Sequence, residues 1–201
     1  MRFNPDNENN SGNESENTNE QGTGGYAGSL LVAHPTLADP NFRRSVILLT
    51  VHSTEEGALG VVLNRPMGKT LGEYDTNLQE PDLANVPLYV GGPVANNQMI
   101  LVAWKWAEEI GRFNLFFGID AERAKALVQE DASVQLRGFI GHAGWTEGQL
   151  EAEIEQGAWL VMPLSPEVEQ RQGVDVWRAL LASVGPEMEI LAREPDDPSK
   201  N

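Results

Sequence analysis

The chain of 201 residues contains no cysteine. Without thiols it can have no disulfide framework, no thiolate nucleophile, no iron–sulfur cluster and no cysteine-ligated zinc. The absence of thiols fits the reducing cytosol, so we expect a cytoplasmic protein. A domain of this size buries about 70% of its unfolded surface, and its core therefore needs no disulfide or metal for stability.

Long apolar runs are also missing, and we expect no leader sequence. No apolar run approaches the roughly 20 residues that cross a bilayer. The first 25 residues are polar and acidic, whereas a signal peptide is basic and then apolar. We therefore expect no membrane association.

Basic residues are scarce, with 14 Lys and Arg against 30 Asp and Glu, a formal net charge of −16. The first 24 residues carry −4 and residues 193–201 carry −1, which leaves −11 of the −16 for the rest. Because nucleic-acid affinity comes mostly from Lys and Arg, this charge argues against a nucleic-acid partner. Direct transcriptional control would need a contiguous basic surface around Arg43, Arg44, Arg65 and Lys69.

Composition divides the chain into one domain and two tails. Residues 1–25 are rich in Asn, Glu, Gly and Ser, and cannot bury enough apolar surface to offset the entropy of ordering. The segment 193–201, with two prolines and three carboxylates, has the same character. We predict disordered tails at both ends and a single domain over residues 26–192.

Short apolar runs with β-branched residues predict the strands. They cover residues 29–33, 45–51, 58–63, 88–90, 99–103, 113–117, 134–140 and 159–162. The second and third runs are expected to form a hairpin across the turn at 55–57. The fourth and fifth are expected to pair in a similar way across Gly91-Gly92-Pro93.

Three helices are expected later in the chain. Asp120 is a good N-cap for residues 121–130. Thr146 and Gln149 form a capping-box pattern for a helix that ends at Gly157, and Asp175 can cap a helix that ends at Gly185. Strands come first and helices later, without strict alternation. This order favours an α+β fold with a mixed, partly barrel-like sheet.

The three histidines, His34, His52 and His142, each end a strand-like run. Three imidazoles can bind zinc and leave one position open, but no two of these lie two or four residues apart. We expect them to be partly buried hydrogen-bonding groups. The sequence predicts no metal site and no cofactor.

The segment from Gly138 to Thr146 has two interpretations. Its glycines either allow a tight turn from a buried strand into a helix, or let an anion approach the amides at the helix start. Glu151 and Glu155 lie one helical turn apart and are interpreted as a solvated face. No serine has the G-x-S-x-G flanks of a nucleophile elbow, so no catalytic residue is identified.

Several long blocks carry a family resemblance. They are G-S-L-L-V-A from Gly28, D-P-N-F from Asp39, G-A-L-G-V-V-L-N-R-P from Gly57, Y-V-G-G-P-V from Tyr89 and G-W-T-E-G-Q-L-E from Gly144. In order and spacing they resemble the AlgH/YqgE family of bacterial proteins across residues 26–185.

The resemblance implies an α+β domain with a partly barrel-like sheet surrounded by helices. Members are mostly uncharacterised, and some are labelled transcriptional regulators. This sequence departs from the family pattern at His34, where Met is more frequent, and at His142, where an aromatic or aliphatic residue is common. The matching positions suggest where a ligand would bind: His52, Asn64, Arg65, Gly91, Gly92, Gly144 and Trp145.

The leading hypothesis is a non-enzymatic binding or regulatory module with a small-molecule or protein partner, because Gly-rich turns at strand ends tend to form pockets. The alternative is a hydrolase on an anionic small molecule, with Arg65 supplying charge and His52 acting as acid or base. That alternative requires His52 and Arg65 to lie close together. The oligomeric state does not follow from the sequence.

Overall fold

The computed structural model describes residues 25–53, 55–107 and 112–193, and the two predicted tails lie almost wholly outside this part of the chain. The strands are β1 Ser29–Ala33, β2 Val46–Ser53, β3 Gly57–Val62, β4 Pro66–Thr70, β5 Pro87–Val90, β6 Val94–Ala107, β7 Arg112–Ile119, β8 Gln135–Trp145 and β9 Trp159–Pro163. The helices are α1 Leu71–Tyr74, a 3-10 helix Thr76–Leu78, α2 Ala121–Glu130, α3 Gln149–Glu155, α4 Glu167–Gln170, α5 Val174–Val184 and α6 Pro186–Arg193. All eight predicted strands form, and β4 was not predicted.

The strands form one nine-stranded sheet in the order β4-β5-β8-β3-β2-β1-β9, with β6 and β7 joined to β8 off this path. Only β5 and β8 pair in parallel. The expected α+β class with a mixed sheet is confirmed, and the sheet is not closed into a barrel. The hairpin of β2 and β3 is also confirmed, because His52 pairs with Ala58 and Ile47 with Val62.

The expected pairing of β5 with β6 is wrong. Both strands pair with the same residues of β8, Gly138 to Ile140, and so lie on opposite sides of it. The backbone that connects β5 to β6 crosses β8 in close contact with the β8 backbone. A Cβ atom on Gly92 would lie 2.2 Å from the carbonyl of His142, so only glycine allows this crossing.

The predicted helices form at the expected places in the chain, but not all of them begin at the predicted residue. Asp120 caps α2 by accepting a hydrogen bond from the Arg123 amide. Helix α5 starts after Gly173, so the predicted cap Asp175 is wrong; it lies inside the first turn and contacts Arg178. Helix α6 was not predicted.

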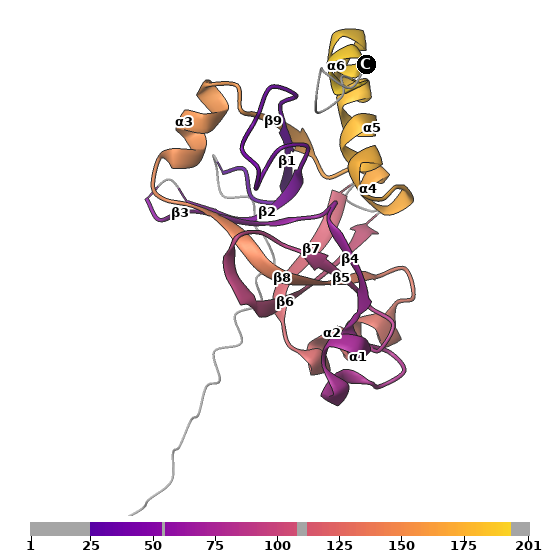
Figure 1. The fold of residues 1–201 in the computed structure, drawn as a ribbon. Coiled ribbons are helices and arrows are strands. Elements are labelled where there is room, and N and C mark those ends of the chain that lie inside the picture. Colours follow the sequence, from indigo (N-terminus) through magenta and orange to yellow (C-terminus); the bar gives the residue numbers. More distant parts are fainter. Residues whose placement is uncertain (1–24, 54, 108–111, 194–201) are drawn as a thin grey trace, which may run out of the picture.

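The sheet separates two groups of helices (Figure 1). Helices α3, α5 and α6 lie beside β1 and β9, while α1 and α2 lie at the other end of the molecule. The larger core cluster includes the buried β1 and β2 residues and the apolar face of α5, with Trp177 and Leu181 among its members. A smaller cluster lies under α1 and α2.

Candidate functional site

The predicted ligand-binding residues fall into two groups. His52 pairs with Ala58, and Ala58 pairs with Trp145, so these three residues lie side by side at one end of the sheet. Asn64 and Arg65 follow the opposite end of β3, where Val62 pairs with Ile47. Ala58 and Val62 are four residues apart along β3, a distance of about 13 Å, and Arg65 lies beyond Val62. The contact between His52 and Arg65 that the hydrolase hypothesis requires is not formed.

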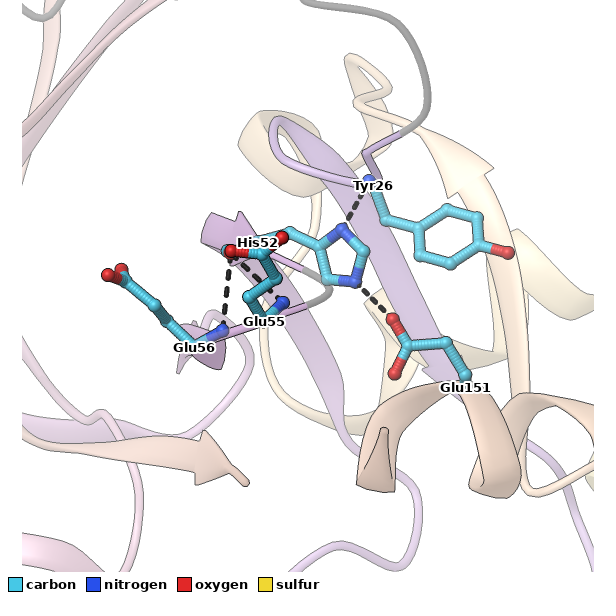
Figure 2. Close-up of polar contacts among 6 residues, drawn as sticks. Tyr26, His52, Glu55, Glu56 and Glu151 are labelled. Carbon is cyan, nitrogen blue, oxygen red and sulfur yellow. Dashed lines mark hydrogen bonds and ion pairs between the residues drawn. The ribbon is translucent and has the colours of Figure 1, made fainter. Parts of the chain in front are cut away.

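Both ring nitrogens of His52 have partners (Figure 2). Nδ1 accepts a hydrogen bond from the Tyr26 amide at 3.1 Å, and Nε2 contacts the Glu151 carboxylate at 2.6 Å. Since an amide can only donate, Nδ1 carries a lone pair and the ring proton is on Nε2, directed at Glu151. The side chain is 2% exposed. His52 therefore fixes the start of the domain to α3.

Glu151 is not the purely solvated group that its sequence position suggested. Its side chain is 32% exposed and closes over His52. The amide of Glu151 itself and then the His52 ring donate hydrogen bonds that lower the pKa of this carboxyl below its ordinary value. The carboxylate is therefore ionised at neutral pH.

Trp145 belongs to a buried aromatic cluster capped by one carboxylate. Its ring packs edge-on against Trp159 at 6.1 Å and is stacked on Phe42 at 6.3 Å. Both indole N–H groups donate to the same oxygen of Glu153, at 2.9 and 2.8 Å. Gln149 donates to the other oxygen. Glu153 therefore satisfies the polar edges of two core tryptophans.

Asn64 is buried and makes three hydrogen bonds to the backbone. Its oxygen accepts from the Val46 amide at 2.9 Å, and its nitrogen donates to the carbonyls of Arg44 at 2.9 Å and Gly173 at 3.2 Å. These bonds connect the starts of β2 and α5. Both N–H groups of the side chain are therefore used within the fold and cannot donate to a ligand.

Arg65 is half-buried beside Arg43, and one of its nitrogens donates to the Arg43 carbonyl at 3.5 Å. Burial, and then the positive charge of Arg43, lower the pKa of Arg65, while Asp39 opposes the shift. The remaining members of the proposed basic surface differ in their surroundings. Arg44 lies over the Trp177 ring at 5.6 Å, and Lys69 is exposed on β4.

Gly91 and Gly92 are buried against β8. A Cβ atom on Gly91 would lie 2.2 Å from the Gly141 carbonyl oxygen. The Gly91 carbonyl accepts from the Val62 amide, and its amide donates to the Ile140 carbonyl. Both glycines are therefore required for close approach of two backbones.

The turn expected within Gly138–Thr146 is wrong, because β8 continues as a strand through Trp145. The other interpretation, an anion site at the helix start, loses its first amide. The Gln149 side chain accepts a hydrogen bond from the Thr146 amide at 3.1 Å, which is the capping-box contact that the sequence predicted. Helix α3 begins later, after Gly148.

Arg137 was missed by the sequence analysis. It is 8% exposed and its guanidinium lies 4.8 Å from the Tyr89 ring centre and 5.0 Å from that of Trp104. Its nitrogens donate to the carbonyls of Val168 at 2.7 Å and Leu63 at 3.4 Å. Burial lowers the pKa of this group. An arginine inside the apolar run V-Q-L-R-G-F-I was the available signal.

A row of partly exposed apolar positions crosses the sheet and was also missed. Val51 pairs with Leu59, and Leu59 pairs with Gly144. The Cβ position of Gly144 lies 3.9 Å from His142 Cδ2, and His142 pairs with Val94. Directly paired residues share a face of a sheet, so these five positions form one surface. We call Val51, Leu59, Gly144, His142 and Val94 the outer stripe.

The outer stripe combines apolar surface with one polar atom that lacks a partner. Val51 is 46% and Val94 is 44% exposed, and Leu59 is half-buried. Nδ1 of His142 is buried, and no described residue gives it a hydrogen bond. Buried polar atoms normally have partners, so this nitrogen is an exception among the described side chains.

Within 25–53, 55–107 and 112–193, no three His, Asp or Glu side chains are grouped to hold a metal ion. In the same ranges no helix is both long and apolar enough to cross a membrane.

Comparison with known proteins identifies relatives over nearly the whole domain. A family model described as AlgH-like matches residues 30–189. A UPF0301 protein of Thermobifida fusca is 35% identical over 198 residues, covering 87% of this chain and 94% of its own. A UPF0301 protein of Streptomyces coelicolor is 39% identical over 190 residues, with the same coverage.

Two solved structures are also similar. A crystal structure from Corynebacterium diphtheriae matches with a TM-score of 0.65 and 29% identity, covering 84% of this chain and 92% of its own. The solution structure of the AlgH protein from Pseudomonas aeruginosa matches with a TM-score of 0.61 and 25% identity, covering 89% and 98%.

Proposed function

The chain belongs to the AlgH-like family, and from that premise we propose that it is a non-enzymatic binding module. Its ligand is a small apolar molecule with one hydrogen-bonding group, and its binding surface is the outer stripe. The observation that carries the proposal is Nδ1 of His142, buried among apolar positions with no partner among the described residues.

The surroundings of the polar groups support binding without catalysis. His52 uses both nitrogens within the fold, and Asn64 uses both ends of its amide. A general acid or base needs a free site within hydrogen-bond reach of the substrate. His142 pairs with Val94 and lies on the same face as Leu59 and Val51, and apolar surface with few polar groups is typical of ligand sites.

The family resemblance divides this proposal into a shared and a specific part. It implies an aromatic or aliphatic residue at the position of His142. The apolar stripe is therefore the part that relatives would share, while the hydrogen bond to an imidazole would be particular to this chain.

Methyl NMR with two matched ligands tests the proposal. Phenol and toluene are similar in shape, but only phenol can hydrogen-bond to Nδ1. We expect phenol to shift the methyl signals of Val51, Leu59 and Val94. In His142→Phe its advantage over toluene should fall by roughly two- to tenfold, the value of one net hydrogen bond.

His34→Phe is the control, because His34 is partly exposed and bonds locally to Thr36. It should leave both affinities unchanged. Phenol shifts confined to other surfaces, or an equal phenol advantage in His142→Phe, would contradict the proposal.

Direct DNA binding has weaker support. Arg65 already interacts with the Arg43 carbonyl and Arg44 with the Trp177 ring, and the carboxylate of Asp39 lies near Arg65. We expect no gel shift with duplex DNA at low salt. A salt-sensitive shift that is lost in Arg43→Gln would favour the regulatory alternative.

A further inference from the structure

Strand β7 forms an edge of the sheet. Its only paired neighbour among the described strands is β6. The pairing runs from Ala107 opposite Arg112 to Leu101 opposite Ile119. In the part of the chain that the structure describes, nothing pairs with the backbone groups on its other side. Such an edge is a template for another strand.

Edges of this kind usually carry features that prevent pairing, and the other two edges of this sheet have them. Strand β4 contains Pro66, Gly68 and Lys69, and β9 is short and ends at Pro163. Proline, lysine and short length all discourage edge-to-edge association. Residues 113–119 of β7, with the sequence F-N-L-F-F-G-I, contain no proline, no lysine and no carboxylate.

Three side chains of β7 pack against the core and remain partly exposed. Phe113, Leu115 and Phe117 pack against the larger core cluster, yet none of the three is fully buried. Trp106 on β6 packs edge-on against Phe113 at 5.0 Å and is itself 49% exposed. The edge therefore offers partly exposed apolar surface.

We propose that β7 pairs in antiparallel fashion with β7 of a second copy of this chain, about a two-fold axis at Leu115. Gly118 has a φ of +65°, which interrupts the extended backbone between Phe117 and Ile119 and leaves residues 113–117 as the regular segment for pairing. The midpoint of this segment is Leu115. Pairing about it sets Phe113 opposite Phe117 of the second copy and Leu115 opposite its own equivalent.

This register is self-complementary, as an isologous interface must be. Residues 113, 115 and 117 face the core cluster in each copy, so the pairing extends one apolar row across both sheets. Aromatic and aliphatic residues directly opposite each other are favourable cross-strand pairs.

The charge of the chain is also compatible with an interface at this edge. Two chains that each carry a net charge of −16 repel each other. The repulsion is smallest for a contact in which neither copy presents a carboxylate. Residues 113–119 meet that condition. The interface is small, so association should be weak, dependent on protein concentration and stronger at high salt, which screens the repulsion.

Sedimentation velocity on the full chain tests the proposal with a matched pair of variants. Asn114→Lys places a positive charge on the paired segment, while Asn97→Lys makes the same change at an exposed position of β6. We expect dimers in the wild type and in Asn97→Lys, and a dissociation constant about tenfold weaker or more in Asn114→Lys. Circular dichroism confirms that both variants fold.

Because the chain has no cysteine, a single introduced thiol reports on the register. Under a diamide oxidant, which takes up two electrons and two protons, two thiols form one disulfide. Leu115→Cys should cross-link readily, since directly opposed residues lie about 4.5–5.5 Å apart at Cα, within disulfide reach. The exposed position in Gln98→Cys should not.

Three results would overturn the proposal. They are a wild type that stays monomeric at high salt and the highest protein concentration reached, equal dimerisation of the two lysine variants, and no excess of cross-linking in Leu115→Cys over Gln98→Cys. If a peptide partner occupied this edge instead, the free protein would remain monomeric.

Discussion

Asn64 offers a sharp test because two roles predict different outcomes. The sequence suggested a ligand-binding residue, whereas its three backbone hydrogen bonds indicate a structural one. Asn64→Ala removes the acceptor of the Val46 amide, and Val46 is fully buried. The carbonyls of Arg44 and Gly173 lose their donor in the same substitution.

The cost follows from these contacts. A buried amide left without a partner costs about 1–3 kcal/mol, and each lost net hydrogen bond costs about 0.5–1.5 kcal/mol. A carbonyl retains a second lone pair and some access to water, so the two carbonyls add less than the full sum. We expect Asn64→Ala to lower the free energy of unfolding by roughly 2–4 kcal/mol.

Urea denaturation followed by circular dichroism measures this loss as a shift in midpoint at constant m-value. The exposed Asn97→Ala is the control and should change stability by less than about 0.5 kcal/mol. Asn64→Asp should be no better tolerated than Asn64→Ala at neutral pH, because its carboxylate would face two carbonyl oxygens. If Asn64→Ala unfolds within about 0.5 kcal/mol of the wild type, the structural role is wrong.

Three further predictions concern stability. Gly91→Ala should cost more than about 3 kcal/mol in urea denaturation, because its Cβ would overlap a carbonyl of β8, whereas Gly148→Ala, with open space, should cost about 1–2 kcal/mol. Glu151→Gln should be less stable than the wild type at neutral pH. Because the folded pKa of Glu151 is lowered, that difference should shrink as pH falls below 4.5, and a pH-independent gap would refute it. Arg137→Met should be about 2 kcal/mol more stable than Arg137→Ala by thermal denaturation, since both lose the charge but Met fills the volume between the two rings.

The candidate site shows why local patterns predict elements better than sites. Gly91 and Gly92 were predicted to form a turn or to belong to a ligand site, but a glycine in a sequence does not reveal which backbone approaches it. Here it is β8, about 50 residues further along the chain. His142 and Val94 meet only because the connection after β5 crosses β8, a topology that no short-range pattern encodes.

Strand pairing was likewise predictable only where the turn was short. The hairpin of β2 and β3 follows from a local turn, whereas β5 and β6 are separated by β8, which comes later in the sequence. The contacts of two partly exposed carboxylates had no sequence signal. Glu151 and Glu153 lie in a charged helical segment that reads as exposed in the sequence. In the structure they contact His52 and Trp145, which the sheet brings close to the helix.

The sequence by itself determined the absence of thiol chemistry, the strong acidity, the number and place of most strands, and the family, because composition and local periodicity carry these properties. Only the tertiary structure decided which residues meet. Register separated His52 from Arg65, placed His142 among exposed valines and left β7 as an open edge. These outcomes depend on contacts between distant segments, whose pairing is selected by the packing of the whole core.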